Sequence, residues 1–248
     1  GHPFPAYAYA EETMLGVIGA LEEEVELLHA GMEISGTATH AEIAVTRGTF
    51  GGTEITLAQC GIGKVNATIC TQMMLDLYHP DAFVFSGVAG GLLPNMRTGD
   101  LIIASHLIQY DMDLTAFGRR PGELPGKDRM IECDPTLVQK AAEAFDAAFP
   151  DAADGPNLML GTVASGDRFV KDQKTLRWLQ REFAAVATEM EGAAFAYTCQ
   201  LSKIPFLVIR GLSDTADESA PNDFDANLNT VCQHSFQLLE QLIPGLGN

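Results

Sequence analysis

Short apolar runs alternate with helical patterns along most of this sequence, and that alternation restricts the fold more than any other feature does. Residues 82–86 and 206–210 are almost continuously apolar, which is typical of strands that are buried on both faces. Between such runs, residues 64–78 and 135–149 have the length and the apolar spacing of helices. Buried strands that alternate with helices indicate a mostly parallel sheet with helices on both faces.

The other predicted elements keep this order, and a Gly51-Gly52 pair joins two β-rich segments as a hairpin would. The predicted fold class is α/β, with a central, mostly parallel mixed β-sheet covered by helices. Because 248 residues, 46% of them apolar, suit one large core, we expect a single domain over residues 14–248. Strands are predicted at residues 15–19, 43–50, 53–60, 82–86, 100–105, 158–163, 184–188 and 206–210, and helices at 22–29, 64–78, 135–149, 172–182, 191–202 and 227–242.

The first thirteen residues need a separate interpretation. Gly1-His2 is typical of a tag scar, and Ala8-Tyr9-Ala10 resembles the small-residue end of a cleaved export signal. We therefore interpret residues 1–13 as a tag scar or a processed N-terminal extension. We expect a cytoplasmic protein, and the Ala8-Tyr9-Ala10 segment leaves a periplasmic or exported location open.

The charge of the chain disfavours several classes of partner. Lys and Arg number 15 and Asp and Glu number 33, which gives a net charge of −18, and no basic cluster interrupts this balance. We therefore expect no nucleic-acid partner. No apolar run reaches the roughly 20 residues that a membrane-spanning helix needs, so we expect no membrane partner either.

Metal and dinucleotide sites are also not expected. The five cysteines are widely spaced, and the six histidines form no cluster or H-E-x-x-H motif, so we predict no metal. Residues 61–66 partly imitate a dinucleotide fingerprint, but Asn66 replaces its third glycine, and no G-x-x-x-x-G-K-[ST] loop occurs. We therefore expect the protein to work without a cofactor.

Carboxylates gather where the predicted strands end. Glu22, Glu23 and Glu24 follow the first strand, Glu189 and Glu191 follow a later one, and Asp214 follows the last. Each of these residues alone could simply be an exposed acid in the first turn of a helix, or a helix cap. The ends of parallel strands meet at one edge of a sheet, however, and like charges in one cleft repel one another. Their convergence would therefore need a functional reason.

Seven motifs, in order, carry a resemblance that spans nearly the whole chain from Met14 onward. The sequence resembles the 5′-methylthioadenosine/S-adenosylhomocysteine nucleosidases of the nucleoside phosphorylase superfamily. The motifs are GVIGALEEEV (16–25), GIGKVNA (61–67), AGGL (89–92), DLTAFG (113–118), SGDRFV (165–170), EMEGAA (189–194) and RGLSD (210–214).

The resemblance implies a hydrolase that cleaves the N-ribosidic bond of 5′-methylthioadenosine and S-adenosylhomocysteine, and of 5′-deoxyadenosine as a further candidate. Asp214 would donate a proton to adenine N7, oriented by Ser213. Glu191 would bind the ribose hydroxyls, and Glu24 would position and deprotonate the attacking water. Such a reaction needs these three tasks because positive charge develops on the ribose as the base departs.

The resemblance also implies the remaining contacts with an adenine nucleoside. Met190 would lie against the ribose, the backbone of Val170 would read the adenine edge, Phe169 would stack on the base, and Arg210 would brace the carboxylates. Val88, Ala89 and Gly90 would line the pocket, Phe224 would close its alkylthio end, and Phe117 and Pro125 would reach in from the second subunit of a homodimer.

One position departs from the family pattern. Many members have a serine where this chain has Val88, so the pocket loses a hydroxyl close to the water and the ribose. The effect on substrate preference stays open at this point.

Hydrolysis is favoured over phosphorolysis. A phosphate site needs cationic compensation, whereas the first strand is followed by Glu22, Glu23 and Glu24 and the 85–88 segment contains no cation. Two alternatives remain: a nucleosidase for aminodeoxyfutalosine in menaquinone synthesis, and a non-catalytic nucleoside-binding module.

Overall fold

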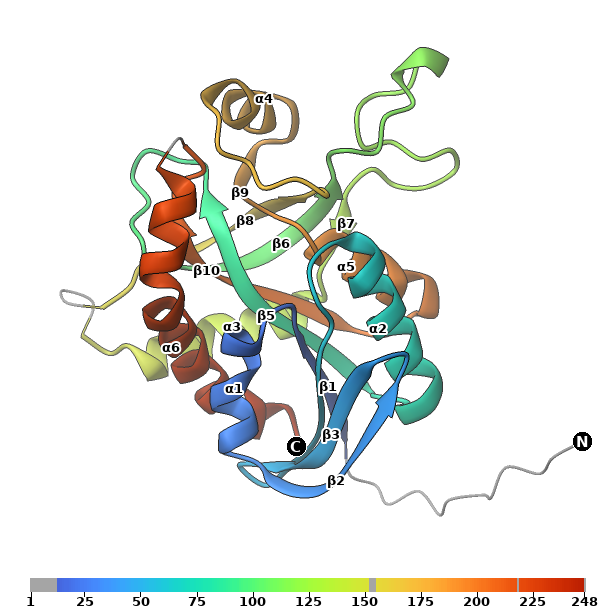
Figure 1. Cartoon of the computed structure of the whole chain (residues 1–248), viewed down its shortest axis with the longest axis vertical. Helices are drawn as coiled ribbons and strands as arrows, with labels where there is room; N and C mark the ends of the chain where they lie inside the picture. Colours follow the sequence, from blue (N-terminus) through green and yellow to red (C-terminus); the bar gives the residue numbers. More distant parts are fainter. Residues whose placement is uncertain (1–12, 152–154, 218, 248) are drawn as a thin grey trace, which may run out of the picture.

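A twisted sheet crosses the molecule and carries helices on both faces (Figure 1). The computed structural model describes residues 13–151, 155–217 and 219–247. The predicted tag scar or processed extension therefore lies, apart from Thr13, outside the described residues. None of the described helices is long and apolar enough to span a membrane.

The described part of the chain forms one sheet in the order β10-β6-β8-β9-β5-β1-β4-β3-β2, with β7 beside β6. β5 also pairs with β10, so that β5, β10, β6, β8 and β9 close into a ring. Strand β5 runs parallel to β1 and β10, whereas β2, β3 and β4 form antiparallel hairpins. The predicted mixed sheet is confirmed. Its strands are β1 (Met14–Gly19), β2 (Glu33–His40), β3 (Ile43–Phe50), β4 (Thr53–Gln59), β5 (Ala82–Gly91), β6 (Leu101–Gln109), β7 (Ile131–Glu132), β8 (Leu158–Ser165), β9 (Ala185–Glu189) and β10 (Phe206–Asp214).

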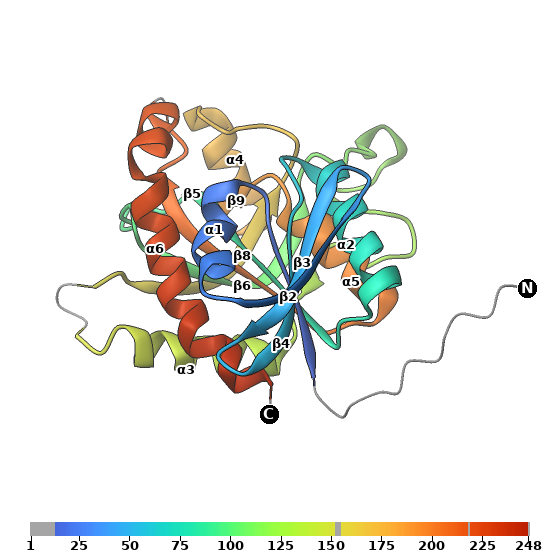
Figure 2. The ribbon, with the colours of Figure 1, turned by 60° about the horizontal axis from the view of Figure 1, so that its bottom comes forward.

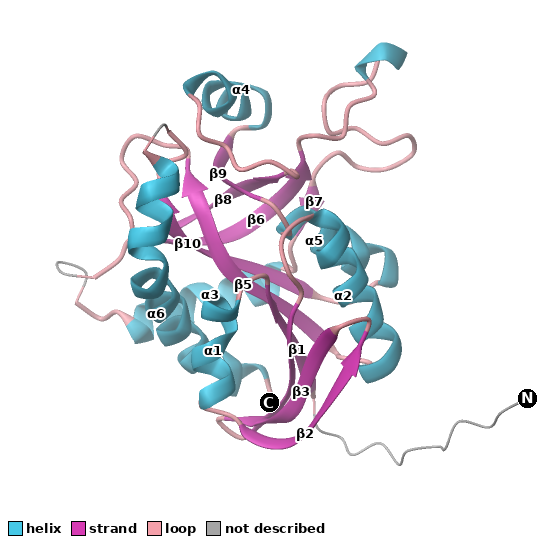
Figure 3. Cartoon of the chain, viewed as in Figure 1, coloured by secondary structure: helices cyan, strands magenta, loops and turns pink. Residues whose placement is uncertain are grey.

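Two helical layers cover the sheet. Helices α2 and α5 lie on one side and α1, α3 and α6 on the other, and each layer buries its own apolar cluster against the strands (Figures 1 and 2). Figure 3 shows the same layers by element type. The helices are α1 (Glu22–Ala30), α2 (Lys64–Tyr78), α3 (Pro135–Ala148), α4 (Gln173–Phe183), α5 (Gly192–Ser202) and α6 (Ala220–Leu246), with a short 3₁₀ helix, η1 (Thr115–Phe117).

Aromatic packing fixes α5 against β5. Phe195 of α5 meets Phe83 and Phe85 edge-on, with ring centroids 5.5 and 5.3 Å apart, and all three rings are fully buried. Edge-to-face pairs of this kind contribute about 0.5–1.5 kcal/mol each beyond their buried area. This contact holds the first turn of α5 against the first half of β5.

Several strands extend beyond the predicted ends. β6 reaches Gln109 rather than Ser105, and β8 reaches Ser165 rather than Val163. β5 continues from Ser86 to Gly91, and β10 continues from Arg210 to Asp214. The predicted strand ends before Gly87 and Gly90, yet β5 and β10 pair through both glycines, with Gly87 beside Arg210 and Gly90 beside Asp214. β2 was not predicted, because this largely exposed edge strand has no alternating apolar residues.

Candidate active site

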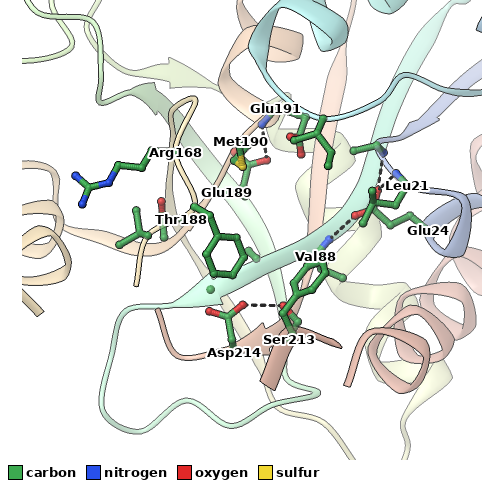
Figure 4. Close-up of a pocket in the computed structure, with 17 residues that line it drawn as sticks. Leu21, Glu24, Val88, Arg168, Thr188, Glu189, Met190, Glu191, Ser213 and Asp214 are labelled. Atoms are coloured by element: carbon green, nitrogen blue, oxygen red, sulfur yellow. Dashed lines mark hydrogen bonds between the residues drawn. The ribbon is translucent and has the colours of Figure 1, made fainter. Parts of the chain in front are cut away.

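A pocket opens where β1, β5, β9 and β10 end and where α1 and α5 begin, as expected at the carboxyl ends of parallel strands (Figure 4). Three carboxyl groups predicted to act together, Glu24, Glu191 and Asp214, all line it. The lining residues are Ala20, Leu21, Glu24, Ile62, Val88, Ala89, Gly90, Arg168, Phe169, Val170, Thr188, Glu189, Met190, Glu191, Ser213, Asp214 and Phe224.

Glu24 lies in the first turn of α1 and bridges two strand ends. Its Oε2 accepts hydrogen bonds from the backbone N–H groups of Ala20 (2.5 Å) and Leu21 (2.9 Å), and its Oε1 accepts one from Val88 (3.1 Å). Burial raises the pKa of Glu24, while the nearby charge of Arg210 and the three N–H groups oppose that rise. The carboxyl group therefore caps the helix and faces the pocket at once.

Glu191 immediately precedes α5. Its Oε2 accepts a hydrogen bond from the backbone N–H of Gly63 at 2.9 Å, which links it to the turn before α2. Burial, reinforced by the negative charge of Glu189, raises the pKa of Glu191 to about 8, against the opposing charge of Arg210. A group with this pKa can take up or release a proton near neutral pH.

Asp214 is the last residue of β10. Its Oδ2 accepts a hydrogen bond from the Ser213 hydroxyl and its Oδ1 accepts one from the backbone N–H of Ala216, both at 2.9 Å. Burial raises the pKa of Asp214; these two hydrogen bonds oppose the rise, and the charges of Asp223 and Asp217 add to it. A raised pKa suits an acid that must keep its proton until the leaving group takes it.

Gly90 provides the room for this carboxyl group. A Cβ atom at position 90 would lie 2.7 Å from Oδ1 of Asp214. A side chain there would push the carboxyl group out of its place, so Gly90 of the AGGL motif (89–92) has a steric reason within the site.

A buried ion pair lies beneath the pocket. Arg210 donates from Nε (3.0 Å) and from Nη2 (2.5 Å) to Oε2 of Glu189, and both side chains are almost wholly inaccessible. The guanidinium group also stacks on Phe85, 4.5 Å from the ring centroid. Arg210 thus holds Glu189 directly and acts on Glu24 and Glu191 through its charge, without lining the pocket itself.

Apolar side chains enclose the rest of the pocket. Phe169 and Phe224 meet edge-on with centroids 5.8 Å apart, and Met190, Val170 and Val88 line the wall beside them. A cavity with apolar walls and a few polar groups is typical of a site for a small organic ligand.

Besides Arg210, two predicted site residues, Phe117 and Pro125, do not line this pocket. Phe117 and Pro125 belong to the excursion between β6 and β7, which projects from the body of the molecule (green in Figure 1). Both are exposed, and 82% of the Phe117 surface is accessible. Neither can contribute to the pocket of its own chain in this arrangement.

Sequence reasoning missed several lining residues, namely Ala20, Leu21, Ile62, Arg168 and Thr188. Ala20 and Leu21, Ile62 and Arg168 fall inside motifs that were identified, so proximity within a motif is the signal that could have found them. Thr188 directly precedes such a motif. Among the residues that the structure describes, no group of three or more His, Cys, Asp or Glu could hold a metal ion.

Sequence comparisons with known proteins match a part of the chain that includes every residue lining the pocket. Residues 14–244 match the model of the phosphorylase superfamily. The chain is 38% identical over 228 residues, 92% of its own length and 95% of the relative's, to a 5′-methylthioadenosine/S-adenosylhomocysteine nucleosidase of Geobacillus kaustophilus.

Solved structures agree with this match. The nucleosidase of that name from Neisseria meningitidis, in complex with methylthio-immucillin-A, has a TM-score of 0.88 and 33% identity, over 94% of this chain and 99% of that one. Futalosine hydrolase of Helicobacter pylori has a TM-score of 0.88 and 34% identity, over 94% and 98% of the two chains.

Proposed function

Since the chain belongs to the phosphorylase superfamily, and within it to the 5′-methylthioadenosine/S-adenosylhomocysteine nucleosidases, we propose that it hydrolyses the N-ribosidic bond of these two nucleosides and releases adenine. The observation that carries the proposal is the convergence of Glu24, Glu191 and Asp214 on one pocket. Their spacing along the chain, across 190 residues, makes a purely local explanation insufficient.

Asp214 is the general acid of this reaction. Its raised pKa keeps the proton available, and protonation of adenine N7 turns the base into a neutral leaving group. The Ser213 hydroxyl, which donates to Oδ2, holds the carboxyl group in one orientation. Phe169 and Val170, on the neighbouring loop, bind the face and the edge of the base.

Glu191 and Glu24 serve the ribose. As the C–N bond breaks, positive charge develops on the sugar, and a carboxylate placed in a buried pocket stabilises it strongly. Because the pKa of Glu191 is about 8, this group is largely protonated near neutral pH and can both donate a hydrogen bond to a ribose hydroxyl and accept one from it. Glu191 binds the ribose hydroxyls, with Met190 against the sugar, and Glu24 orients the water and accepts its proton. The backbone N–H groups of Ala20, Leu21 and Val88 hold the Glu24 carboxyl group in position before the substrate binds.

Water rather than phosphate is the nucleophile. Arg168 is the one cationic residue among the described pocket-lining side chains, and its guanidinium group is paired with Asp172 at 2.8 Å. Arg210 is committed to Glu189. A phosphate dianion would meet Glu24 and Glu191 without an unpaired cation to compensate it.

The alkylthio group lies between Phe224 of the same chain and Phe117 and Pro125 of the second subunit of a homodimer. The 82% exposure of Phe117 on a projecting segment leaves its ring accessible to a second subunit, as this arrangement requires. A single domain over residues 14–248 and a cytoplasmic location stay predictions.

The function is tested by incubating the purified protein with 5′-methylthioadenosine in phosphate-free buffer and following adenine by chromatography. We expect complete release of adenine with no sugar phosphate when phosphate is added. An absolute requirement for phosphate would overturn the choice of water, and the absence of any turnover would favour the non-catalytic binding module.

A second candidate substrate is aminodeoxyfutalosine. The similarity to futalosine hydrolase of Helicobacter pylori favours it, because that structure matches this chain as well as the nucleosidase structure does. Competition between the two nucleosides in one reaction distinguishes them, since the ratio of their kcat/KM values follows directly from the product ratio. We expect 5′-methylthioadenosine to be consumed first, and preferential consumption of aminodeoxyfutalosine would reverse the order of the two candidates.

A further inference from the structure

A hydroxyl group beneath the pocket joins three segments of the fold. Ser165 is the last residue of β8, is fully buried and does not line the pocket. Its Oγ donates a hydrogen bond to Oε1 of Glu189, at the end of β9. The same Oγ accepts a hydrogen bond at 2.8 Å from the backbone N–H of Ala193, in the first turn of α5. The Ser165 hydroxyl thus links the ends of β8 and β9 to the start of α5.

The carboxyl group of Glu189 caps α5 from the same place. Its Oε2 accepts hydrogen bonds from the backbone N–H of Gly192 at 2.8 Å, from that of Glu191 at 3.3 Å and from Nε of Arg210 at 3.0 Å. The first N–H groups of a helix have no partner within the helix, and the positive end of the helix dipole favours a carboxylate there. Glu189 therefore holds the backbone around Glu191, and Ser165 holds the other oxygen of the Glu189 carboxyl group.

These contacts lie on the ribose side of the proposed site. Figure 4 shows Glu189 next to Met190 and Glu191, and apart from Ser213 and Asp214. The proposed function places the ribose against Met190 and Glu191 and the purine against Asp214. A shift in the start of α5 would therefore displace Glu191 from the ribose and leave the acid in place.

The loop that follows Ser165 and carries Phe169 has backbone supports that do not need the hydroxyl. The N–H of Tyr110 donates to the Ser165 carbonyl oxygen at 3.0 Å, and the N–H of Gly166 donates to the Glu189 carbonyl oxygen at 3.1 Å. Loss of the Ser165 hydroxyl would leave both of these bonds intact. The base-binding part of the pocket should then change less than the ribose-binding part.

We propose that Ser165 is a positioning residue for the hydrolysis: its hydroxyl, acting through Glu189, holds the start of α5 so that Glu191 meets the ribose in one fixed place. This inference rests on the proposed function. Without the hydroxyl, the buried N–H of Ala193 loses its acceptor and Oε1 of Glu189 loses this donor, which is costly in a buried place. Both losses loosen the segment that carries Glu191, and small misplacements of groups around a reacting centre reduce its rate strongly.

Ser165→Ala tests the proposal because it removes only the hydroxyl. We expect kcat/KM for 5′-methylthioadenosine to fall on the order of tenfold. The dissociation constant of free adenine, measured by calorimetry, should stay within about twofold of that of the unmodified protein. Ser165→Cys, which has nearly the same shape and a weaker donor, should lose less activity than Ser165→Ala.

Thr198→Val is the matched control, because Thr198 also buries its hydroxyl and lies in the same helix. That hydroxyl donates at 2.8 Å to the carbonyl oxygen of Ala194, one turn earlier in α5, and makes no contact with the helix start. Both kcat/KM and the dissociation constant of adenine should stay within about twofold of the original values in this variant.

Two results would overturn the proposal. One is a kcat/KM of Ser165→Ala within about twofold of the original, and the other is an equal loss of kcat/KM and of adenine affinity, which indicates a general disturbance of the pocket. If Ser165→Ala does not fold, Ser165→Cys is measured against the same two results. Absence of nucleoside cleavage by the unmodified protein would refute the proposed function itself, whereas normal cleavage by both proteins would refute this inference alone.

Discussion

The buried carboxyl groups of the pocket share one cause for their raised pKa values but differ in what opposes it. Burial comes first for Glu24, Glu191 and Asp214 alike. The Glu24 carboxyl group accepts hydrogen bonds from three backbone N–H groups, whereas that of Glu191 accepts one and also lies near the negative charge of Glu189. Burial is therefore the shared cause of the raised pKa values, whereas the hydrogen bonds and charges that oppose it differ from residue to residue.

The titration of Glu191 predicts a pH-dependent difference in stability. Its pKa rises from 4.5 to about 8 on folding, so between these values the folded protein holds a proton that the unfolded chain has released. The contribution of Glu191 to the free energy of unfolding therefore falls as pH rises through this window. Glu191→Gln does not titrate and keeps an acceptor for Gly63. We expect the thermal midpoint of the variant, measured from about pH 5 to about pH 9, to increase relative to that of the unmodified protein as the pH rises to about 8. A constant or shrinking difference would contradict the assigned pKa.

Gly90 predicts a catalytic effect of one added methyl group. In Gly90→Ala the new Cβ displaces the Asp214 carboxyl group, and kcat should fall on the order of 100-fold, since small misplacements of reacting groups are costly. Gly36→Ala is the control, because a Cβ there meets nothing within 4 Å. Normal kcat in Gly90→Ala would show that the proton does not come from the observed position of Asp214.

At the scale of elements, one lysine links three segments around the pocket. Lys64, the first residue of α2, donates from Nζ to Oδ1 of Asp111 at 2.6 Å and from its backbone to Oδ1 of Asp167 at 2.8 Å. The backbone N–H of Asp167 donates to Oδ2 of Asp111 at 2.9 Å. The loops after β4, β6 and β8 are thereby held together, and the last of them carries Phe169.

Removing this link should loosen the base-binding loop more than the catalytic groups. We expect Lys64→Met to raise KM for 5′-methylthioadenosine roughly tenfold, with a smaller change in kcat, because substrate binding must then order the loop. Lys174→Met, an exposed change on α4, should leave both constants unaltered. A fall in kcat at constant KM would place the effect of Lys64 on the chemical step instead.

The order of the elements could be predicted from the sequence because burial on both strand faces leaves a clear pattern. α2 (Lys64–Tyr78) and β3 (Ile43–Phe50) have the predicted bounds. The ends of β5 and β10 could not be predicted, because glycines that usually mark turns are used here to let side chains approach the strands closely. The edge strand β2 forms because it pairs with β3, and the hydrophobic pattern of β2 alone does not predict this pairing.

At the scale of the whole molecule, the site combines groups that sequence motifs identify with groups that only packing reveals. Positions after strands indicated a set of acidic residues, and the family resemblance selected Glu24, Glu191 and Asp214 from it; the pocket brings these three together. The contacts of the Ser165 hydroxyl and the loop contacts of Lys64 depend on neighbours distant in sequence. Such features leave no local signal in a single sequence.

The proposed homodimer predicts complementation between two defective chains. Phe117→Ala should weaken catalysis by removing a wall of the partner's pocket, and Asp214→Asn should inactivate the pocket of its own chain. When the two variants are unfolded, mixed and refolded, one pocket of each mixed dimer has both an intact Asp214 and an intact Phe117. Activity should therefore exceed that of either variant alone. Activity no higher than that of the Phe117→Ala protein would contradict a shared site.

The most direct measurement compares the unmodified protein with Asp214→Asn, using 5′-methylthioadenosine in phosphate-free buffer. The amide keeps the shape of the carboxyl group and has no acidic proton to give to N7. We predict rapid release of adenine by the unmodified protein, and intact nucleoside bound to, and recovered from, the variant. Adenine release by Asp214→Asn at a rate within about tenfold of the original would contradict the account, because an essential general acid contributes on the order of 100-fold or more.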